Sequence, residues 1–256
     1  MGFRNPARFC CRSTKVFALR YENQLLDLRG IEAAIFDLDG TLVESEPVWA
    51  EAKRYVANRE NVEVSEQVLM AYVGRSVADF VNEIIAPTNA PSITRDIVER
   101  ALSHYDNNVD EIPGASDLIK EFSRNGFATA ICSSAPERAI QKCMQLLNIE
   151  LCINTVVSTE FLAKGKPNKF PYVETLRRLG IPSEKVVVFE DAPAGLASAI
   201  SAGIKTICVG SSVNSRKFDC ELYARSIGDI SLVASPDRKS TRLNSSTIRS
   251  RMPSSA

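Results

Sequence analysis

Residues 34–42 read AIFDLDGTL, an apolar run that stops at two aspartates, Asp37 and Asp39, placed one residue apart. In an extended chain, residues i and i+2 point to the same side, so both carboxylates emerge together where a strand ends. Carboxylates this close repel each other unless a cation lies between them, and a divalent metal removes the conflict. The alternative interpretation is a solvated Asp-Gly turn, which is common at the ends of strands.

The composition is that of an ordinary globular protein: 256 residues, 45% hydrophobic and 24% charged. Lys plus Arg equals Asp plus Glu, 31 each, so no overall field favours nucleic acid or an anionic membrane as a partner. No apolar stretch approaches the roughly 20 residues of a membrane span. Seven cysteines without a CxxC pair indicate reduced thiols and no zinc site. We therefore expect a cytoplasmic protein with a small-molecule partner, and the sequence leaves its oligomeric state open.

Both ends of the chain differ from the remainder. Residues 1–21 contain five basic residues and no acid, which is typical of an organellar transit peptide; a start codon assigned too far upstream gives the same pattern. We interpret residues 1–30 as an N-terminal extension and expect the first strand near Ile31. Residues 236–256 have no hydrophobic period and resemble the in-frame translation of a sequencing adapter, so we interpret them as a non-native tail. A basic arm for nucleic acid is the alternative.

Between the two ends, short apolar segments alternate with amphipathic ones. We expect strands at Ala33–Phe36, Ala128–Cys132, Thr155–Val157, Val186–Phe189 and Thr206–Val209, and helices at Ala115–Arg124, Glu137–Leu147, Phe170–Leu179 and Ala194–Ala202. This alternation predicts an α/β fold with a Rossmann-like parallel sheet, formed by residues 31–45 and 113–235. Functional sites of such sheets lie beyond the carboxyl ends of the strands.

Residues 46–112 break this alternation, because their pattern is helical throughout. We expect helices at Val48–Asn58, Glu66–Val73, Val77–Ile85 and Thr94–Tyr105, with a turn at residues 87–92. The position of this segment, directly after the first strand and its aspartates, predicts an inserted α-helical cap. A cap placed there can close over the site and exclude water.

Side chains suited to phosphate chemistry follow four of the expected strands. The strand ends carry Asp37 and Asp39, then Ser133 and Ser134, then Lys166 in a Gly-Lys-Pro sequence, and then Glu190 and Asp191. Neighbouring parallel strands would bring these ends into one crevice. The set contains carboxylates for a hard divalent ion, a lysine and serines for phosphate oxygens, and a carboxylate nucleophile.

These motifs together resemble those of the haloacid dehalogenase superfamily of hydrolases. DxDGT at residues 37–41, a serine after a hydrophobic strand, GKP at residues 165–167 and the acidic pair at 190–191 occur in the family's order, and the resemblance covers roughly residues 31–233. The chain is most similar to the phosphatase-like branch with a helical cap after the first motif, which includes β-phosphoglucomutase-like proteins. The resemblance implies a Mg²⁺-dependent phosphatase that hydrolyses a small, sugar-phosphate-like metabolite through an aspartyl phosphate.

The resemblance also implies roles for the aspartates and the metal ligands. Asp37 would be the nucleophile, and Asp39 would protonate the leaving oxygen and later activate water. Mg²⁺ would be held by the Asp37 carboxylate, the backbone carbonyl of Asp39 and Asp191. Glu190 would lie nearby, as a ligand or as an acid that only supports the ligands.

Phosphate binding would fall to Ser133 and Lys166, which contact the transferring phosphoryl group and neutralise its charge. Ser134 in place of Ser133, and a Lys166 exposed in a basic loop, are the alternatives. In the cap, Arg75 lies between expected helices, where it would contact a polar or anionic substrate group or form part of a solvated turn.

Two departures from the family pattern bear on function. Relatives usually carry Pro-Asp where this chain has Lys169-Phe170, which puts the geometry of that loop in question. Sugar-phosphate mutases of this branch carry a histidine where this chain has Trp49, which disfavours a mutase. A phosphosugar mutase and a non-catalytic phosphate-binding protein therefore stand as the alternatives to a phosphatase.

Overall fold

The computed structural model describes residues 16–210 and 218–235. Its centre is a six-stranded sheet with the order β10-β9-β8-β3-β6-β7, in which all neighbouring strands are parallel. The strands are β3 (Ala33–Phe36), β6 (Ala128–Ser133), β7 (Thr155–Ser158), β8 (Val186–Glu190), β9 (Lys205–Val209) and β10 (Leu222–Ala224). The predicted α/β fold with a parallel sheet is confirmed, and β10 is an edge strand that the sequence pattern did not predict.

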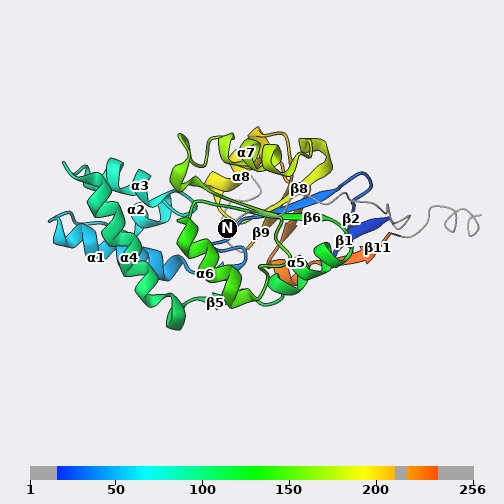
Figure 1. Cartoon of the computed structure of the whole chain (residues 1–256), viewed down its shortest axis with the longest axis horizontal. Coiled ribbons are helices and arrows are strands. Elements are labelled where there is room, and N and C mark those ends of the chain that lie inside the picture. Colours follow the sequence, from blue (N-terminus) through cyan, green and yellow to red (C-terminus); the bar gives the residue numbers. More distant parts are fainter. Residues whose placement is uncertain (1–15, 211–217, 236–256) are drawn as a thin grey trace, which may run out of the picture.

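Helices cover both faces of this sheet (Figure 1). Helices α5 (Ala115–Arg124) and α6 (Glu137–Leu147) lie on one face, and α7 (Phe170–Leu179) and α8 (Pro193–Ser201) lie on the other. Because side chains alternate along a strand, Phe36 of β3 faces the core shared with α5 and α6, while Ile35 faces the core shared with α7 and α8. Both faces of β3 are therefore fully buried, as expected for a central parallel strand.

A group of helices lies between two short strands, β4 (Val43–Glu44) and β5 (Asp110–Glu111), which pair antiparallel. The helices are α1 (Glu46–Arg59), α2 (Glu66–Ala71), α3 (Val77–Phe80), the π-helical turn η1 (Val81–Ile85) and α4 (Ala90–Asn108). Figure 1 shows them beyond one end of the sheet, apart from the helices that flank it, and we use the name cap for this helical group, residues 46–108. Helix α4 begins earlier than expected, because Pro91 occupies its first turn, where proline is well tolerated. No helix within the described ranges combines the length and apolar character needed to cross a membrane.

The expectation that the first strand begins near Ile31 is wrong. Strands β1 (Phe17–Tyr21) and β2 (Gln24–Asp27) form a hairpin, and β1 also pairs with β11 (Ser231–Ala234) in an antiparallel sheet. The two-residue turn between them has Glu22 at a φ of 50°. The basic composition of residues 1–21 concealed the alternation in which Leu19 is buried and Arg20 is exposed. Residues 1–15 and 236–256, which carry half of the extension and all of the proposed tail, lie outside the described residues.

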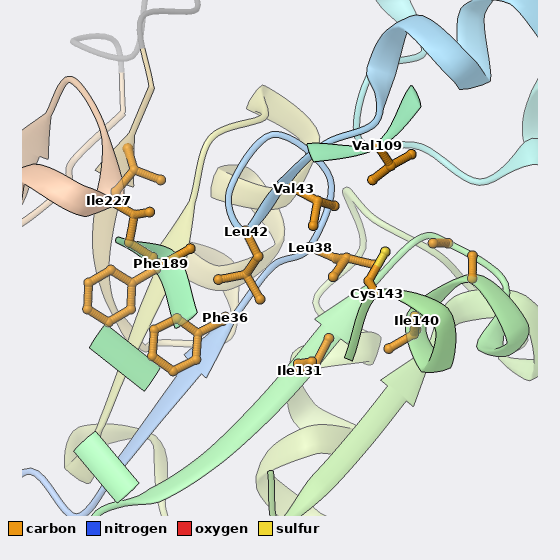
Figure 2. Close-up of a cluster of buried hydrophobic side chains, with 14 of the residues drawn as sticks. Phe36, Leu38, Leu42, Val43, Val109, Ile131, Ile140, Cys143, Phe189 and Ile227 are labelled. Atoms are coloured by element: carbon orange, nitrogen blue, oxygen red, sulfur yellow. The ribbon is translucent and has the colours of Figure 1, made fainter. Parts of the chain in front are cut away.

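The loop after β3 is anchored by its apolar residues. Leu38 and Leu42 are fully buried, and Figure 2 shows them with Val43 in a cluster that includes Ile131 and Cys143. The amide of Leu42 donates to the carbonyl of Leu38 at 2.8 Å, which closes the loop. Burial of Leu38 between Asp37 and Asp39 fixes the backbone that carries both carboxylates.

Candidate active site

The register of the central strands brings three segments to one level at the carboxyl end of the sheet. Phe36 pairs with Ile131 on one side and with Phe189 on the other. The residues that follow these three are Asp37, Cys132 and Glu190, and the amide of Asp37 donates to the carbonyl of Phe189 at 3.0 Å. Residues 37, 132 and 190 are therefore neighbours although they are far apart in the sequence.

Three buried carboxylates meet at this point. One oxygen from each of Asp37, Glu190 and Asp191 lies within 4.8 Å of the others. The structure thus brings together three of the four acids that the sequence analysis grouped around a metal. Oxygen ligands at this spacing suit a hard divalent cation such as Mg²⁺.

Lys166 lies inside this carboxylate group. Its Nζ donates to Asp37 Oδ1 at 2.5 Å, to Glu190 Oε1 at 2.5 Å and to the carbonyl oxygen of Cys132 at 2.9 Å, and the residue is only 2% exposed. Burial alone would lower the pKa of Lys166, but the carboxylates of Asp37 and Glu190 outweigh it and raise that pKa. The structure therefore contradicts the alternative of an exposed Lys166 in a surface loop.

One ammonium group does not neutralise three carboxylates. Burial is the largest cause that raises the pKa of Asp37 and of Asp191 well above its ordinary value, and the neighbouring carboxylates raise both further. Residual negative charge in a buried site is what a bound divalent cation would offset. The residues present therefore fit Mg²⁺, with Asp37 and Asp191 as the carboxylates best placed to hold it.

Glu190 is occupied by other contacts. Its Oε1 accepts from Lys166 and from the hydroxyl of Tyr172 at 2.8 Å, and its Oε2 accepts from the amide of Ala192 at 3.3 Å. A Cβ at Gly195 would lie 1.8 Å from Oε1, so the carboxylate packs against backbone that only glycine can provide. Glu190 is thus placed to orient Lys166, in line with the supporting role left open above. Tyr172 was missed, since one tyrosine in an amphipathic helix looks like any core aromatic.

The carboxylate of Asp191 is held by the DxDGT loop. Its Oδ1 accepts from the hydroxyl of Thr41 at 2.9 Å. A Cβ at Gly40 would lie 2.2 Å from Asp191 Oδ2, and Gly40 has a φ of +80° that L side chains rarely adopt. In this motif, Gly40 therefore allows the carboxylate of Asp191 to approach the backbone closely, and Thr41 donates a hydrogen bond to it.

Asp39 points away from this carboxylate group and toward the cap. Its Oδ1 accepts from Trp49 Nε1 at 3.0 Å and from the hydroxyl of Ser45, and its Oδ2 lies 3.4 Å from the hydroxyl of Ser133. The side chain of Asp39 therefore stands outside the metal group, and its predicted metal contact is one through its backbone carbonyl. Ser45 and Trp49 were not predicted as its partners, because their placement depends on how α1 docks.

The two serines after β6 face different partners. Ser133 is fully buried, and its hydroxyl accepts from the amide of Ala135 at 2.9 Å and approaches Asp39. The hydroxyl of Ser134 instead donates to the carbonyl of Gly74 in the cap at 2.8 Å. Ser133 thus lies beside the carboxylates, whereas Ser134 joins the core to the cap.

A pocket of about 360 Å³, part of it open to solvent, lies between this group and the cap. Asp37 and Asp39 line its floor, and cap residues that include Glu46, Lys53 and Arg75 line its roof. The guanidinium of Arg75 lies over the ring of Tyr72 at 4.5 Å and donates to Glu83 at 3.1 Å. Arg75 therefore borders the pocket, but its charge is already paired.

The departure at Lys169-Phe170 leaves the neighbouring loop closed. The amide of Phe170 donates to Asn168 Oδ1 at 3.0 Å, which forms a local turn directly ahead of α7. The carbonyl of Asn168 in turn accepts from the hydroxyl of Ser198 on α8 at 2.6 Å. Lys166 keeps its buried position beside Asp37.

Known proteins share this sequence and architecture. Residues 34–209 match the family described as haloacid dehalogenase-like hydrolase. The phosphorylated carbohydrates phosphatase of Thermotoga maritima is 28% identical over 181 residues, 69% of this chain and 84% of that protein. Hexitol phosphatase B of Escherichia coli K12 is 28% identical over 188 residues, 71% of this chain and 84% of that protein.

Solved structures show the same fold. A β-phosphoglucomutase from Clostridium difficile matches with a TM-score of 0.71 at 21% identity, over 77% of this chain and 92% of that one. CbbY from Rhodobacter sphaeroides, solved in complex with phosphate, matches with a TM-score of 0.68 at 24% identity, over 77% and 95% of the two chains. With the family match across residues 34–209, the chain belongs to the haloacid dehalogenase-like hydrolases and is an enzyme of their phosphatase-like branch.

Proposed function

We propose that this protein is a Mg²⁺-dependent phosphatase that hydrolyses a small, sugar-phosphate-like metabolite through an aspartyl phosphate on Asp37. The observation that carries the proposal is the contact of Lys166 with both Asp37 and Glu190 inside a buried carboxylate group. Similarity to phosphatases that act on phosphorylated carbohydrates and hexitols supports the substrate class.

Asp37 is suited to attack phosphorus. Lys166 holds its Oδ1, and no hydrogen bond from the described residues reaches its Oδ2, which is therefore the oxygen that would form the bond. A bound Mg²⁺, held by Asp37 and Asp191, would neutralise phosphate charge. The ammonium of Lys166 adds a fixed positive charge beside the transition state, where such charges are most effective.

Asp39 is suited to move the proton. Its carboxylate is oriented by Trp49 and Ser45 toward the cap side of the pocket, where a leaving group would lie. It would donate a proton to the leaving oxygen and then take one from the water that hydrolyses the aspartyl phosphate. The cap, joined to the core through Ser134 and Gly74, would keep bulk water out.

A phosphosugar mutase is the competing function, and Trp49 disfavours it. A mutase needs a further acid or base from the cap, and the indole Nε1 of Trp49 is only a donor, already directed at Asp39. The similarity to the β-phosphoglucomutase structure, at 21% identity, concerns the fold.

The test is hydrolysis of p-nitrophenyl phosphate with and without Mg²⁺. We expect turnover only with the metal, and a loss of at least about 10³-fold in Asp37→Asn, because the amide is not a nucleophile. Equal turnover by Asp37→Asn, or none by the wild type with Mg²⁺, would contradict the proposal. Free phosphate as the product of hexose and hexitol phosphates would separate a phosphatase from a mutase, which returns a phosphorylated sugar.

A further inference from the structure

Lys53 is a buried lysine of the cap side that forms no ion pair with the described residues. It lies on α1 and is 4% exposed, and it makes no hydrogen bond or ion pair with any residue of the described ranges. Its recorded contact is with the face of Phe80, with Nζ 5.8 Å from the ring centre. The carboxylates of Glu46 and Asp39 attract its charge, but neither comes within the 4.0 Å of an ion pair, so an anionic ligand in the pocket would complete its contacts.

The side chain of Lys53 opens into the pocket already described. Glu46, Trp49 and Lys53 all line that pocket, and their spacing of three and four residues places them on one face of α1. Trp49 contacts Asp39, and Lys53 lies about 6 Å farther along the helix axis at a rise of about 1.5 Å per residue. A leaving group that starts at Asp39 would therefore extend toward Lys53.

The other charges of the cap do not compensate Lys53 as they compensate Arg75. Arg75 is paired with Glu83, and the carboxylate of Asp79 is 3.9 Å away. Glu46 and Asp39 both attract the charge of Lys53, yet neither forms an ion pair with it within 4.0 Å. Of the two cations named among the pocket-lining residues on the cap side, Lys53 is the one without an ion pair to a described residue, while Arg75 keeps only its Nε without a hydrogen bond.

We propose that Lys53 binds a second anionic group, a carboxylate or a phosphate, at the end of the substrate remote from the transferred phosphoryl group. The inference rests on the proposed phosphatase function and narrows its substrate class. Lys53 lies one turn of α1, a rise of about 6 Å, beyond Trp49 and its contact with Asp39, and this short span favours a short leaving group. The preferred substrate is therefore a short phosphomonoester with a negatively charged far end.

Matched substrates test this directly. Glycolate 2-phosphate is compared with 2-hydroxyethyl phosphate, and propane-1,3-diol bisphosphate with 3-hydroxypropyl phosphate, so that each pair differs mainly in the far group. We expect the wild type to prefer the anionic member of at least one pair by about 10- to 100-fold in kcat/KM, the size of one charge-assisted hydrogen bond. The pair that shows the preference distinguishes a carboxylate from a phosphate.

The variants are Lys53→Met and Lys53→Arg, with Lys185→Met as the control. Lys185 precedes β8 at the opposite end of the sheet and pairs with Glu32 at the surface. Lys53→Met should abolish the preference, Lys53→Arg should retain part of it, and Lys185→Met should keep it whole. The inference is overturned if the wild type has nearly equal kcat/KM values for the two members of both pairs, or if Lys53→Met shows the same preference as the wild type.

A binding measurement separates this inference from the phosphatase proposal. Trp49 is the single tryptophan of the chain and lines the pocket, so its fluorescence should report binding to the Asp37→Asn protein. We expect glycolate 2-phosphate to bind about tenfold or more tightly than 2-hydroxyethyl phosphate, and Lys53→Met in that background to remove the difference. Equal affinities overturn the role of Lys53 even if p-nitrophenyl phosphate is hydrolysed, whereas absent hydrolysis with this difference intact counts against the phosphatase alone.

Discussion

The two sides of the pocket differ in how their buried charged side chains are paired. On the sheet side, Lys166 contacts Asp37 and Glu190, and Thr41 donates to Asp191, so each of these side chains has a partner within the protein. On the cap side, Lys53 is as deeply buried as these groups but forms no hydrogen bond or ion pair with the described residues. The same fold thus contains a set of buried charged groups that are hydrogen-bonded within the protein and, across the pocket, a buried cation that forms no such bond in the described part of the chain.

This difference indicates a division of labour. Strand register and the close approach of glycines fix the sheet side, so the groups that would act on phosphorus stay in place with or without a ligand. The cap side is built on one face of α1 and leaves the charge of Lys53 for a substrate to satisfy. We infer that the sheet side sets the reaction and the cap side selects the molecule that undergoes it.

The largest effect should come from removing the cation of the sheet side. In Lys166→Met, Asp37 and Glu190 lose their shared donor, and the charge that would stabilise the transferring phosphoryl group is lost. We expect kcat/KM for p-nitrophenyl phosphate to fall by about 10³-fold, as when a main electrostatic contact to a transition state is removed. Steady-state kinetics at saturating Mg²⁺ measures this, with Lys185→Met as the surface control. A loss below tenfold would mean that Lys166 and its carboxylate partners are structural and not catalytic.

The sheet side was largely predictable from sequence, because its positions follow from strand ends. An apolar run that ends in acids specifies both the strand and the edge where Asp37 and Asp191 appear, and parallel pairing then brings them together. Lys166 was predicted in the same way, from its place after an expected strand. What the pattern could not supply was Tyr172, whose hydroxyl reaches Glu190 only because α7 packs on the sheet.

The cap side was less predictable. Its helices were expected, but which face of α1 meets the pocket depends on docking, so Trp49 as a partner of Asp39 and the placement of Lys53 were not foreseen. The hairpin of β1 and β2 was missed for a related reason, since its strands are short and gain their partner from β11 near the other end of the chain. Contacts over such long separations leave no local period in the sequence.

A smaller effect should appear in the free energy of unfolding. It should show that the buried carboxylate of Glu46 on the cap side destabilises the folded protein. Burial is the main cause that raises the pKa of Glu46 from 4.5 to about 7. Between these values the folded protein binds a proton that the unfolded chain has released, so the free energy of unfolding falls as the pH rises through this window. Since a pKa change of one unit corresponds to about 1.4 kcal/mol and the site is partly open, the total should be about 1–3 kcal/mol.

The comparison of Glu46→Gln with the wild type isolates this contribution. Glutamine resembles the protonated acid, so the two proteins should be nearly equally stable at pH 5, and the variant should be about 1–3 kcal/mol more stable at pH 8. Urea unfolding at pH 5, 6.5 and 8 gives these differences, and Glu63→Gln, at an exposed position after α1, serves as the control. If the difference in stability between Glu46→Gln and the wild type does not change with pH, the buried carboxylate of Glu46 does not destabilise the folded protein.

The smallest effect should come from the contact that joins the two sides. Trp49→Phe removes the hydrogen bond from Nε1 to Asp39 Oδ1 but leaves the donor Ser45 in place. One hydrogen bond to a charged group contributes about 1.5 kcal/mol or somewhat more, so kcat should fall by roughly tenfold. Tyr105→Phe, which keeps the ring that packs edge-on against Trp49 at 5.9 Å, controls for packing and should change kcat by less than about twofold. If Trp49→Phe instead costs as much as Lys166→Met, the cap takes part in the chemical step itself, and the division between the side that reacts and the side that selects does not hold.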